Sequence, residues 1–147
     1  MNVVSRLTVV GGLLLVIVAI LSLGALYRSP YVTQVGVPKL QPVPFSHKHH
    51  VAGMGIDCRY CHTSVEDGPF AGIPPIETCM TCHSQIWADS PMLAPVRESW
   101  ETSRPLKWVR VNDLPDFVYF DHSVHINKGV GCVTCHGRVD QMPLTWK

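Results

Sequence analysis

The sequence carries almost no net charge and few charged residues of either sign. Its 12 Lys and Arg are balanced by 11 Asp and Glu, and charged residues make up 16% of the chain, against about 25% in typical soluble domains. The sequence therefore lacks the clustered basic excess that nucleic-acid binding requires, and we expect no nucleic-acid partner. It also has no proline, cysteine or histidine before Pro30 and no charged residue from Leu7 to Leu26. The chemically reactive residues thus all follow one apolar N-terminal segment.

That apolar segment has the length and the flanks of a membrane-spanning helix. About 20 helical residues cross the roughly 30 Å of hydrocarbon in a bilayer, and Arg6 and Arg28 bound the segment. A cleaved signal peptide is the alternative, but its apolar core usually has only about 7–15 residues. We therefore predict a transmembrane anchor at residues 1–28, embedded in lipid, a proline-containing tether at 29–44 and one small domain at 45–147.

All six cysteines fall into three pairs, and a histidine follows each pair. The motifs read C-R-Y-C-H, C-M-T-C-H and C-V-T-C-H. C-x-x-C-H is the attachment signature of c-type haem, in which two thiols bond the haem vinyl groups and the next imidazole binds the iron. The predicted attachment residues are Cys58, Cys61, Cys79, Cys82, Cys132 and Cys135, and the predicted proximal iron ligands are His62, His83 and His136.

Zinc and disulfides are the alternatives to haem. The spacing between Cys61 and Cys79 suits a four-cysteine zinc site, but that site leaves Cys132 and Cys135 unused. Disulfides or thioredoxin-like pairs leave the histidine after each pair unexplained. Haem accounts for every cysteine, and c-type haem is attached on the outer side of the cytoplasmic membrane. We therefore expect a single-pass protein with a cytoplasmic N-terminus and its haem domain in the periplasm or outside the cell.

An internal repeat supplies candidates for the second axial ligand of each iron. Residues 45–50 read F-S-H-K-H-H and residues 120–125 read F-D-H-S-V-H, and each segment leads through a glycine to a cysteine pair. Ser46 and Asp121 are good helix N-caps, and residues three apart share one helix face. His49 is expected to point away from the iron. The predicted distal ligands are His47, His50, His122 and His125.

Three haems need three distal ligands, whereas the repeat offers four. By spacing, we expect His47 to serve the haem of the Cys58 motif and His122 to serve that of the third motif. Either His50 or His125 then serves the second motif, and we hypothesise that the spare histidine binds a haem held by other polypeptide. Methionine in place of these histidines is the alternative and would raise the haem potential. Bis-histidine ligation gives low-spin iron with no open site, which suits electron transfer.

The predicted fold is a small, mostly irregular and helical multihaem cytochrome c domain on one N-terminal transmembrane helix. We expect the haems to form its core, with short helices and proline-containing turns around them, so the protein without haem should be largely unfolded. Between the second and third motifs we predict a helix from Ser90 to about Ser103. Short strands are predicted at Lys107–Val111 and Phe117–Phe120.

From Phe45 to Pro143 the sequence resembles the multihaem cytochrome c subunit of alternative complex III, a quinol-oxidising respiratory and photosynthetic complex. The resemblance rests on F-S-H-K-H-H, G-I-D-C-R-Y-C-H-T, G-I-P-P-I-E-T-C-M-T-C-H, P-V-R-E-S-W and D-H-S-V-H-I-N-K-G-V-G-C-V-T-C-H-G-R-V-D-Q-M-P. The histidine pairs also resemble those of the wider cytochrome c3/c7 class, whose haems are bis-histidine. In the subunit family the pattern continues past M-P with two more C-x-x-C-H motifs. The resemblance therefore implies haem c as the cofactor, with three haems on these residues and five in the full-length protein.

The resemblance also implies an electron-conducting subunit, not an enzyme on its own. Its implied partners are an iron–sulfur subunit, integral-membrane quinol-oxidising subunits, and a mono-haem cytochrome c subunit or soluble acceptor. The alternative function is a free-standing membrane-anchored quinol dehydrogenase, in which a haem near the bilayer meets quinol directly. The long segment between Tyr27 and Cys58 favours the conducting subunit.

Overall fold

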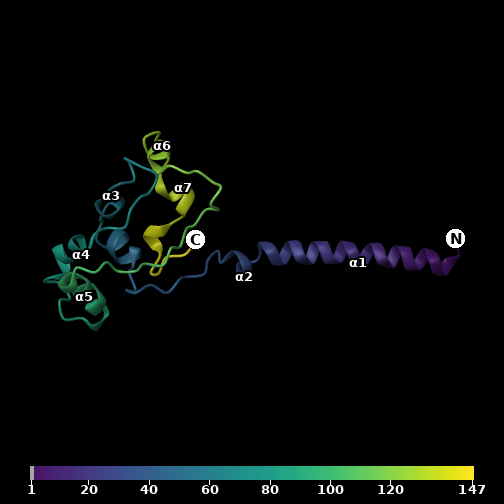
Figure 1. The fold of residues 1–147 in the computed structure, drawn as a ribbon, viewed down its shortest axis with the longest axis horizontal. Coiled ribbons are helices and arrows are strands. Elements are labelled where there is room, and N and C mark those ends of the chain that lie inside the picture. Colours follow the sequence, from purple (N-terminus) through teal and green to yellow (C-terminus); the bar gives the residue numbers. More distant parts are fainter. Residues whose placement is uncertain (1) are drawn as a thin grey trace. The chain divides into compact units, whose positions relative to one another are not determined.

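The computed structural model describes residues 2–147 and divides the chain into two compact units, Met1–Val37 (unit 1) and Pro38–Lys147 (unit 2). Met1, the first residue of the predicted anchor, lies outside the described residues. Figure 1 labels the α-helices of both units.

Unit 1 is built on one long apolar helix, α1 (Val3–Arg28). It begins where the side chain of Asn2 accepts a hydrogen bond from the Ser5 N–H at 2.8 Å, the usual role of an N-cap residue. It ends at Ser29, because the residue before a proline is disfavoured in helical conformation. A single helical turn, α2 (Pro30–Thr33), follows within the predicted tether.

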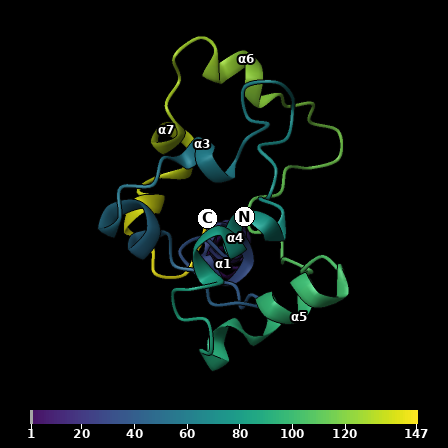
Figure 2. The ribbon, with the colours of Figure 1, turned by 90° about the vertical axis from the view of Figure 1, so that its left-hand side faces the viewer.

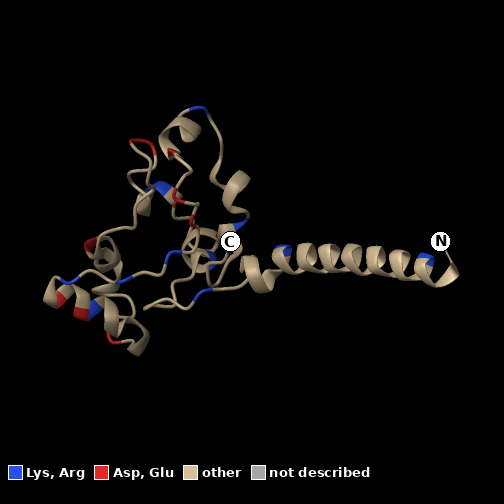
Figure 3. Cartoon of the chain, turned by 45° about the vertical axis from the view of Figure 1, so that its right-hand side comes forward, with Lys and Arg blue, Asp and Glu red and all other residues tan. Residues whose placement is uncertain are grey.

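The length and composition of α1 allow it to cross a membrane. Basic residues occur only near its two ends, and it has no acidic residue, whereas acidic and basic residues are interspersed over unit 2 (Figure 3). The prediction of one N-terminal apolar helix is therefore confirmed.

Unit 2 consists of short helices and irregular loops, and residues 2–147 contain no β-strand. The fold prediction of a small, helical and irregular domain is thus confirmed, including the helix expected from Ser90 to about Ser103. In both Figure 1 and Figure 2, α3 lies between α7 and α4. In chain order the elements are the π-helix η1 (Lys48–Gly53), α3 (Cys58–Cys61), α4 (Ile76–His83), the 3₁₀-helix η2 (Pro91–Leu93), α5 (Ala94–Thr102), α6 (His122–Ile126), α7 (Cys132–His136) and the 3₁₀-helix η3 (Val139–Gln141).

The two predicted strands, Lys107–Val111 and Phe117–Phe120, do not form. A side chain takes the place of a partner strand, since the amide of Gln41 accepts from the Val109 N–H at 2.8 Å and donates to the Val109 carbonyl at 2.9 Å. Lys39 likewise donates to the Arg110 carbonyl at 2.8 Å. Backbone groups that are satisfied in this way need no strand, so the β-propensity of the segment is overridden.

Little side chain is buried in unit 2. Val43, Leu93 and Val96 form the one described cluster of buried residues, against which Leu106 and Trp108 pack. Large apolar side chains elsewhere stay on the surface, and Tyr119 is 98% exposed. A domain of this length with so few buried residues lacks the usual hydrophobic core. The remaining buried residues in the described part of the chain are Val65, Ser99 and Met142.

Candidate functional site

Each C-x-x-C-H motif folds into a short helix that brings its two thiols together. The first pair forms α3, where the Asp57 side chain caps the helix by accepting from the Arg59 N–H at 2.8 Å. The second pair lies in the last turns of α4, and the third forms α7. On a helix, positions three apart are neighbours, which is the spacing that attachment of one group through two thiols requires.

The structure brings the histidine after each cysteine pair opposite a histidine of the F-x-H-x-x-H repeat. The ring centroids of His47 and His62 lie 6.5 Å apart, with an angle of 11° between their planes. Those of His122 and His136 lie 6.2 Å apart, also at 11°.

The second motif takes its partner from the first repeat. His50 faces His83 with ring centroids 6.1 Å apart and 68° between the planes. Of the two candidates that the sequence leaves open, His50 and His125, it is His50 whose ring faces His83. His125 packs on Phe120 and stacks on no other aromatic ring among residues 2–147.

These three distances fit one metal ion between each pair of imidazoles. Two imidazoles that bind a metal from opposite sides, with bonds of about 2 Å and ring centres about 1 Å behind the nitrogens, have centroids about 6 Å apart. The angle between the planes is free to vary, because each ring can rotate about the shared axis. The residues present therefore fit bis-histidine haem at all three motifs.

In most of these histidines the ring nitrogen Nδ1 already makes a hydrogen bond within the protein. Nδ1 of His62 donates to the Gly72 carbonyl at 2.7 Å, and Nδ1 of His83 donates to the Ile86 carbonyl at 3.0 Å. Nδ1 of His47 lies 3.0 Å from the Thr145 hydroxyl. Metal-binding histidines commonly hold their second nitrogen in this way, which leaves Nε2 for the metal. Similar contacts join His50 to the Ser46 carbonyl at 2.8 Å, His122 to the Pro69 carbonyl at 2.7 Å and His125 to the Asp121 carbonyl at 2.8 Å.

Burial keeps several of these imidazoles neutral. It lowers the pKa of His47 to about 4, with further lowering by His62 and His50 nearby. Burial also lowers the pKa of His50 and of His136. Neutral imidazole is the form that binds a metal ion, so these rings are ready to bind iron at neutral pH.

The first cysteine motif adjoins both of the others. Burial raises the pKa of the Cys58 thiol, and the neighbouring thiol of Cys132 raises it further. On the other side, the pKa of Cys79 is raised by burial and then by Cys61 nearby. A small hollow of about 220 Å³ lies where α3 approaches the loop before α7. Haems attached to neighbouring motifs would therefore be held close to one another.

Contacts from the loop after the first motif also hold the third site in place. The Gly68 carbonyl accepts from the Ser123 N–H at 3.3 Å, and the Glu66 carbonyl accepts from the Asn127 side chain at 3.1 Å. A contact also joins the first motif to the second: the hydroxyl oxygens of Tyr60, in the first motif, and Thr81, in the second, lie 3.4 Å apart. The three motifs thus form one connected structure.

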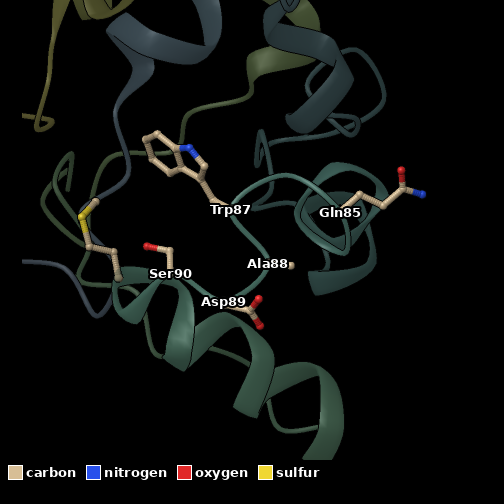
Figure 4. Close-up of a pocket in the computed structure, with 6 residues that line it drawn as sticks. Gln85, Trp87, Ala88, Asp89 and Ser90 are labelled. Carbon is tan, nitrogen blue, oxygen red and sulfur yellow. The ribbon is translucent and has the colours of Figure 1, made fainter.

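His49 does not face a histidine that follows a cysteine pair, although its ring lies edge-to-face against that of His50 with centroids 5.5 Å apart. It is exposed, and its ring lies 6.0 Å from that of Trp87, with 15° between the planes. Trp87 lines an open hollow of about 510 Å³ between α4 and α5, to which none of the predicted haem residues contributes (Figure 4). The side chains of Gln85 and Asp89, which also line this hollow, point away from the Trp87 ring in Figure 4. This hollow is therefore separate from the cysteine–histidine sites.

The first repeat departs from the predicted α-helix. The Ser46 hydroxyl accepts from the His49 N–H at 3.2 Å, as an N-cap would, but η1 then continues as a π-helix. Such wider turns are frequently found at functional sites. The second repeat follows the expectation, since the Asp121 side chain caps α6 by accepting from the Ser123 N–H at 2.9 Å.

The alternatives to haem have no structural counterpart in the described residues. All six cysteines are free thiols, and residues 2–147 contain no group of three or more His, Cys, Asp and Glu side chains placed to hold a metal ion. Four methionines could bind iron in place of the distal histidines: Met54, Met80, Met92 and Met142. Met142 is buried and Met80 packs against the small core cluster, whereas Met54 and Met92 are exposed.

Sequence reasoning missed the residues that orient the histidines. The carbonyls of Gly72 and Pro69 lie in an irregular loop with no periodic pattern, so no sequence signal marked them. From the sequence, Phe45 and Phe120 are only the first residues of the two repeats. Their rings stack on His50 at 4.4 Å and on His125 at 4.8 Å, and their place in both repeats is the signal that could have revealed this.

Replacing Gly72 with alanine should disturb the carbonyl that holds His62. Gly72 has φ +75°, and an added Cβ would lie 2.8 Å from the Ser64 hydroxyl. Backbone strain of this kind costs about 1–3 kcal/mol, so we expect a loss of that order in the unfolding free energy of the haem-loaded protein, measured with denaturant. Gly68→Ala is the matched control, because its Cβ meets nothing within 4 Å. Unchanged stability of Gly72→Ala would contradict the role given to this turn.

Comparison with known proteins places these motifs in a family. Residues 28–104, just over half of the chain, match the Class III cytochrome C family. Over 99 residues the chain is 40% identical to "Menaquinone reductase, multiheme cytochrome c subunit" of Nitratidesulfovibrio vulgaris (strain Hildenborough). The match covers 67% of this chain and 46% of that protein, so the chain spans about half the length of its relative. Membership in this family implies covalently bound c-type haem. The fold, the motifs and the match agree, and the chain belongs to the Class III cytochrome C family.

Proposed function

We propose that each cysteine motif of this chain attaches one c-type haem and that the facing histidines hold its iron. His47 and His62 serve the first haem, His50 and His83 the second, and His122 and His136 the third. The observation that carries this proposal is the distance between the ring centroids of the three pairs, which is 6.5, 6.1 and 6.2 Å, close to the roughly 6 Å that a shared metal ion requires. The haems supply one-electron iron couples. The protein fixes both axial ligands and leaves no iron position open to substrate.

We infer that the chain conducts electrons and does not itself transform a substrate. The haem of the Cys58 motif would lie between the other two, because α3 lies between α7 and α4 (Figure 1 and Figure 2). The hydroxyls of Tyr60 and Thr81 lie 3.4 Å apart on one side, and Cys58 and Cys132 line the same hollow on the other. Electron tunnelling slows steeply with distance, so haems held on neighbouring motifs would favour transfer along this order. Electrons would then pass along the haems in the order second motif, first motif, third motif.

The angles between the facing imidazoles predict distinct electron paramagnetic resonance signals. The near-parallel planes at the first and third sites, 11° each, separate the iron dxz and dyz orbitals and give ordinary rhombic low-spin signals. The 68° angle at the second site leaves these orbitals nearly degenerate, so that haem should give a strongly anisotropic signal. Spectra of the oxidised protein, with His50→Met to identify the anisotropic signal, would test this. Three equivalent rhombic signals would contradict the geometry.

The setting we propose is a quinone-linked membrane complex of the alternative complex III type. Support comes from the apolar helix α1 and from the relative, which is named as a subunit of a menaquinone reductase. Quinone chemistry would then take place in other subunits, with iron–sulfur and integral-membrane subunits on one side and a mono-haem cytochrome or soluble acceptor on the other. We place the N-terminus in the cytoplasm and unit 2 on the periplasmic side, where c-type haem is attached.

Purification from native membranes tests this proposal. Pyridine haemochrome and intact mass would give the haems per polypeptide, and mass spectrometry would identify co-purifying subunits. We expect at least three haems on this polypeptide, quinone-dependent activity in the complex and none in the separated chain. Quinol oxidation by the separated chain would instead favour a free-standing quinol dehydrogenase.

A further inference from the structure

His47 differs from the other facing histidines in what its second ring nitrogen contacts. Its Nδ1 lies 3.0 Å from the hydroxyl oxygen of Thr145, a side chain 98 positions away in the sequence. Backbone carbonyls take this place at four of the other facing histidines, which are His50, His62, His83 and His122. A backbone carbonyl is present whatever the side chain, whereas the contact to His47 depends on which residue occupies position 145.

The segment that carries Thr145 is fixed against η1, which holds His47 at its start. The Met142 carbonyl accepts from the Lys48 N–H at 3.0 Å, and Met142 is buried. In both Figure 1 and Figure 2 the yellow segment that ends at C runs beside the blue turn of η1. Thr145 and His47 are both half-buried. The hydroxyl is therefore held at the imidazole by the backbone on either side of it.

The direction of this hydrogen bond follows from the proposed ligation. An imidazole that binds iron through Nε2 carries its proton on Nδ1, so Nδ1 of His47 donates and the Thr145 oxygen accepts. An acceptor at Nδ1–H draws the proton toward itself and makes the imidazole a more basic ligand. A more basic ligand favours ferric over ferrous iron, so the bond lowers the reduction potential of the haem.

The same bond limits rotation of the His47 ring about its axis to the metal. The ring of Phe45 lies edge-to-face against His47, with centroids 4.9 Å apart and 86° between the planes. With Thr145 at Nδ1, the ring is thus held both at its face or edge and at its nitrogen. The outcome is the angle of 11° between His47 and His62.

We propose that Thr145 is a positioning residue for the haem of the first motif: its hydroxyl accepts from Nδ1 of His47, holds that imidazole near-parallel to His62 and lowers the reduction potential of the haem. This inference rests on the proposed function. Because the first haem would lie between the other two, its potential decides whether electrons pass on to the next haem or remain on it.

The test is the reduction potential of each haem in the haem-loaded protein in its native membrane complex, followed by electron paramagnetic resonance at a series of potentials. Thr145→Val keeps the shape of the side chain and removes the acceptor. We expect the potential of the first haem to shift to a more positive value and its rhombic signal to change shape, with the other two haems unchanged. Thr145→Ser retains a hydroxyl and should restore both properties.

Thr102→Val is the matched control for this exchange. The Thr102 hydroxyl donates to the Glu98 carbonyl at 2.6 Å within α5, which contributes no facing histidine, so all three potentials should keep their wild-type values. A wild-type potential in Thr145→Val would overturn the inference. A shift in Thr145→Ser as large as that in Thr145→Val would also overturn it, because the effect would then come from packing and not from the hydroxyl.

His47→Met separates failure of this inference from failure of the proposed function. It should raise the potential of the first haem and add the far-red band of methionine-to-iron charge transfer, which also identifies the signal of that haem. If His47→Met alters one haem while Thr145→Val alters none, only the role of Thr145 is wrong. If His47→Met alters no haem, the proposed ligation itself fails. Thr145→Ala covers the case in which Thr145→Val does not assemble, and a potential shifted in the same direction is expected.

Discussion

Removal of the haem of the first motif should interrupt electron flow through the chain. In Cys58→Ala with Cys61→Ala, the second and third motifs keep their cysteines and ligands but lose the haem that adjoins both. Because tunnelling slows steeply with distance, we expect the transfer rate between the remaining haems to fall by orders of magnitude. Stopped-flow reduction of the complex by its quinone-linked donor, followed at the haem absorption bands, would show a fraction of haem that stays slowly reducible.

The matched control removes a haem at the end of the proposed order. Cys79→Ala with Cys82→Ala leaves unchanged the hollow that Cys58 and Cys132 line together, so transfer between the first and third haems should keep its wild-type rate. Wild-type rates in the double variant at Cys58 would refute the central position.

A second variant keeps this test informative if loss of a haem prevents accumulation of the protein. His47→Met retains the first haem and raises its potential, which makes the central position a trap for electrons. Transfer onward to the third haem should then become slower. His50→Met places the same change on the second haem and should leave transfer between the first and third haems unaffected.

The cysteine motifs were the part of the site most accessible to sequence reasoning, because their chemistry depends only on neighbours in the chain. The choice of His50 over His125 for the second site was not accessible. It depends on how the folded chain brings His83 of α4 opposite His50 of η1, and residues far apart in sequence decide that. The carbonyl of Gly72 that orients His62 lies in a loop without periodicity, so local propensity contains no information about it.

Local propensity also produced the errors in the fold. Lys107–Val111 has the composition of a strand, but the Gln41 side chain satisfies the Val109 backbone, and the pattern does not reveal a partner so distant in sequence. The helix from Pro91 to Thr102 was predictable, since its proline start and its length are local properties. In a domain organised around prosthetic groups, sequence pattern predicts ligands and local turns better than long-range packing.

Without haem, unit 2 should be largely unfolded while α1 stays helical. Unit 2 has few buried side chains, such as Val43, Leu93 and Val96. The free energy gained by burying them is small compared with the backbone conformational entropy lost when the whole unit becomes ordered. Helix α1 satisfies its backbone hydrogen bonds internally. Chain produced in cells without the haem-attachment machinery and purified in detergent should therefore show the helix content of α1 alone by circular dichroism, with rapid hydrogen exchange throughout unit 2. The haem-loaded protein in the same detergent is the control. A cooperative unfolding transition of the haem-free unit 2, with protected amides beyond the Val43 cluster, would mean that side chains alone form its core.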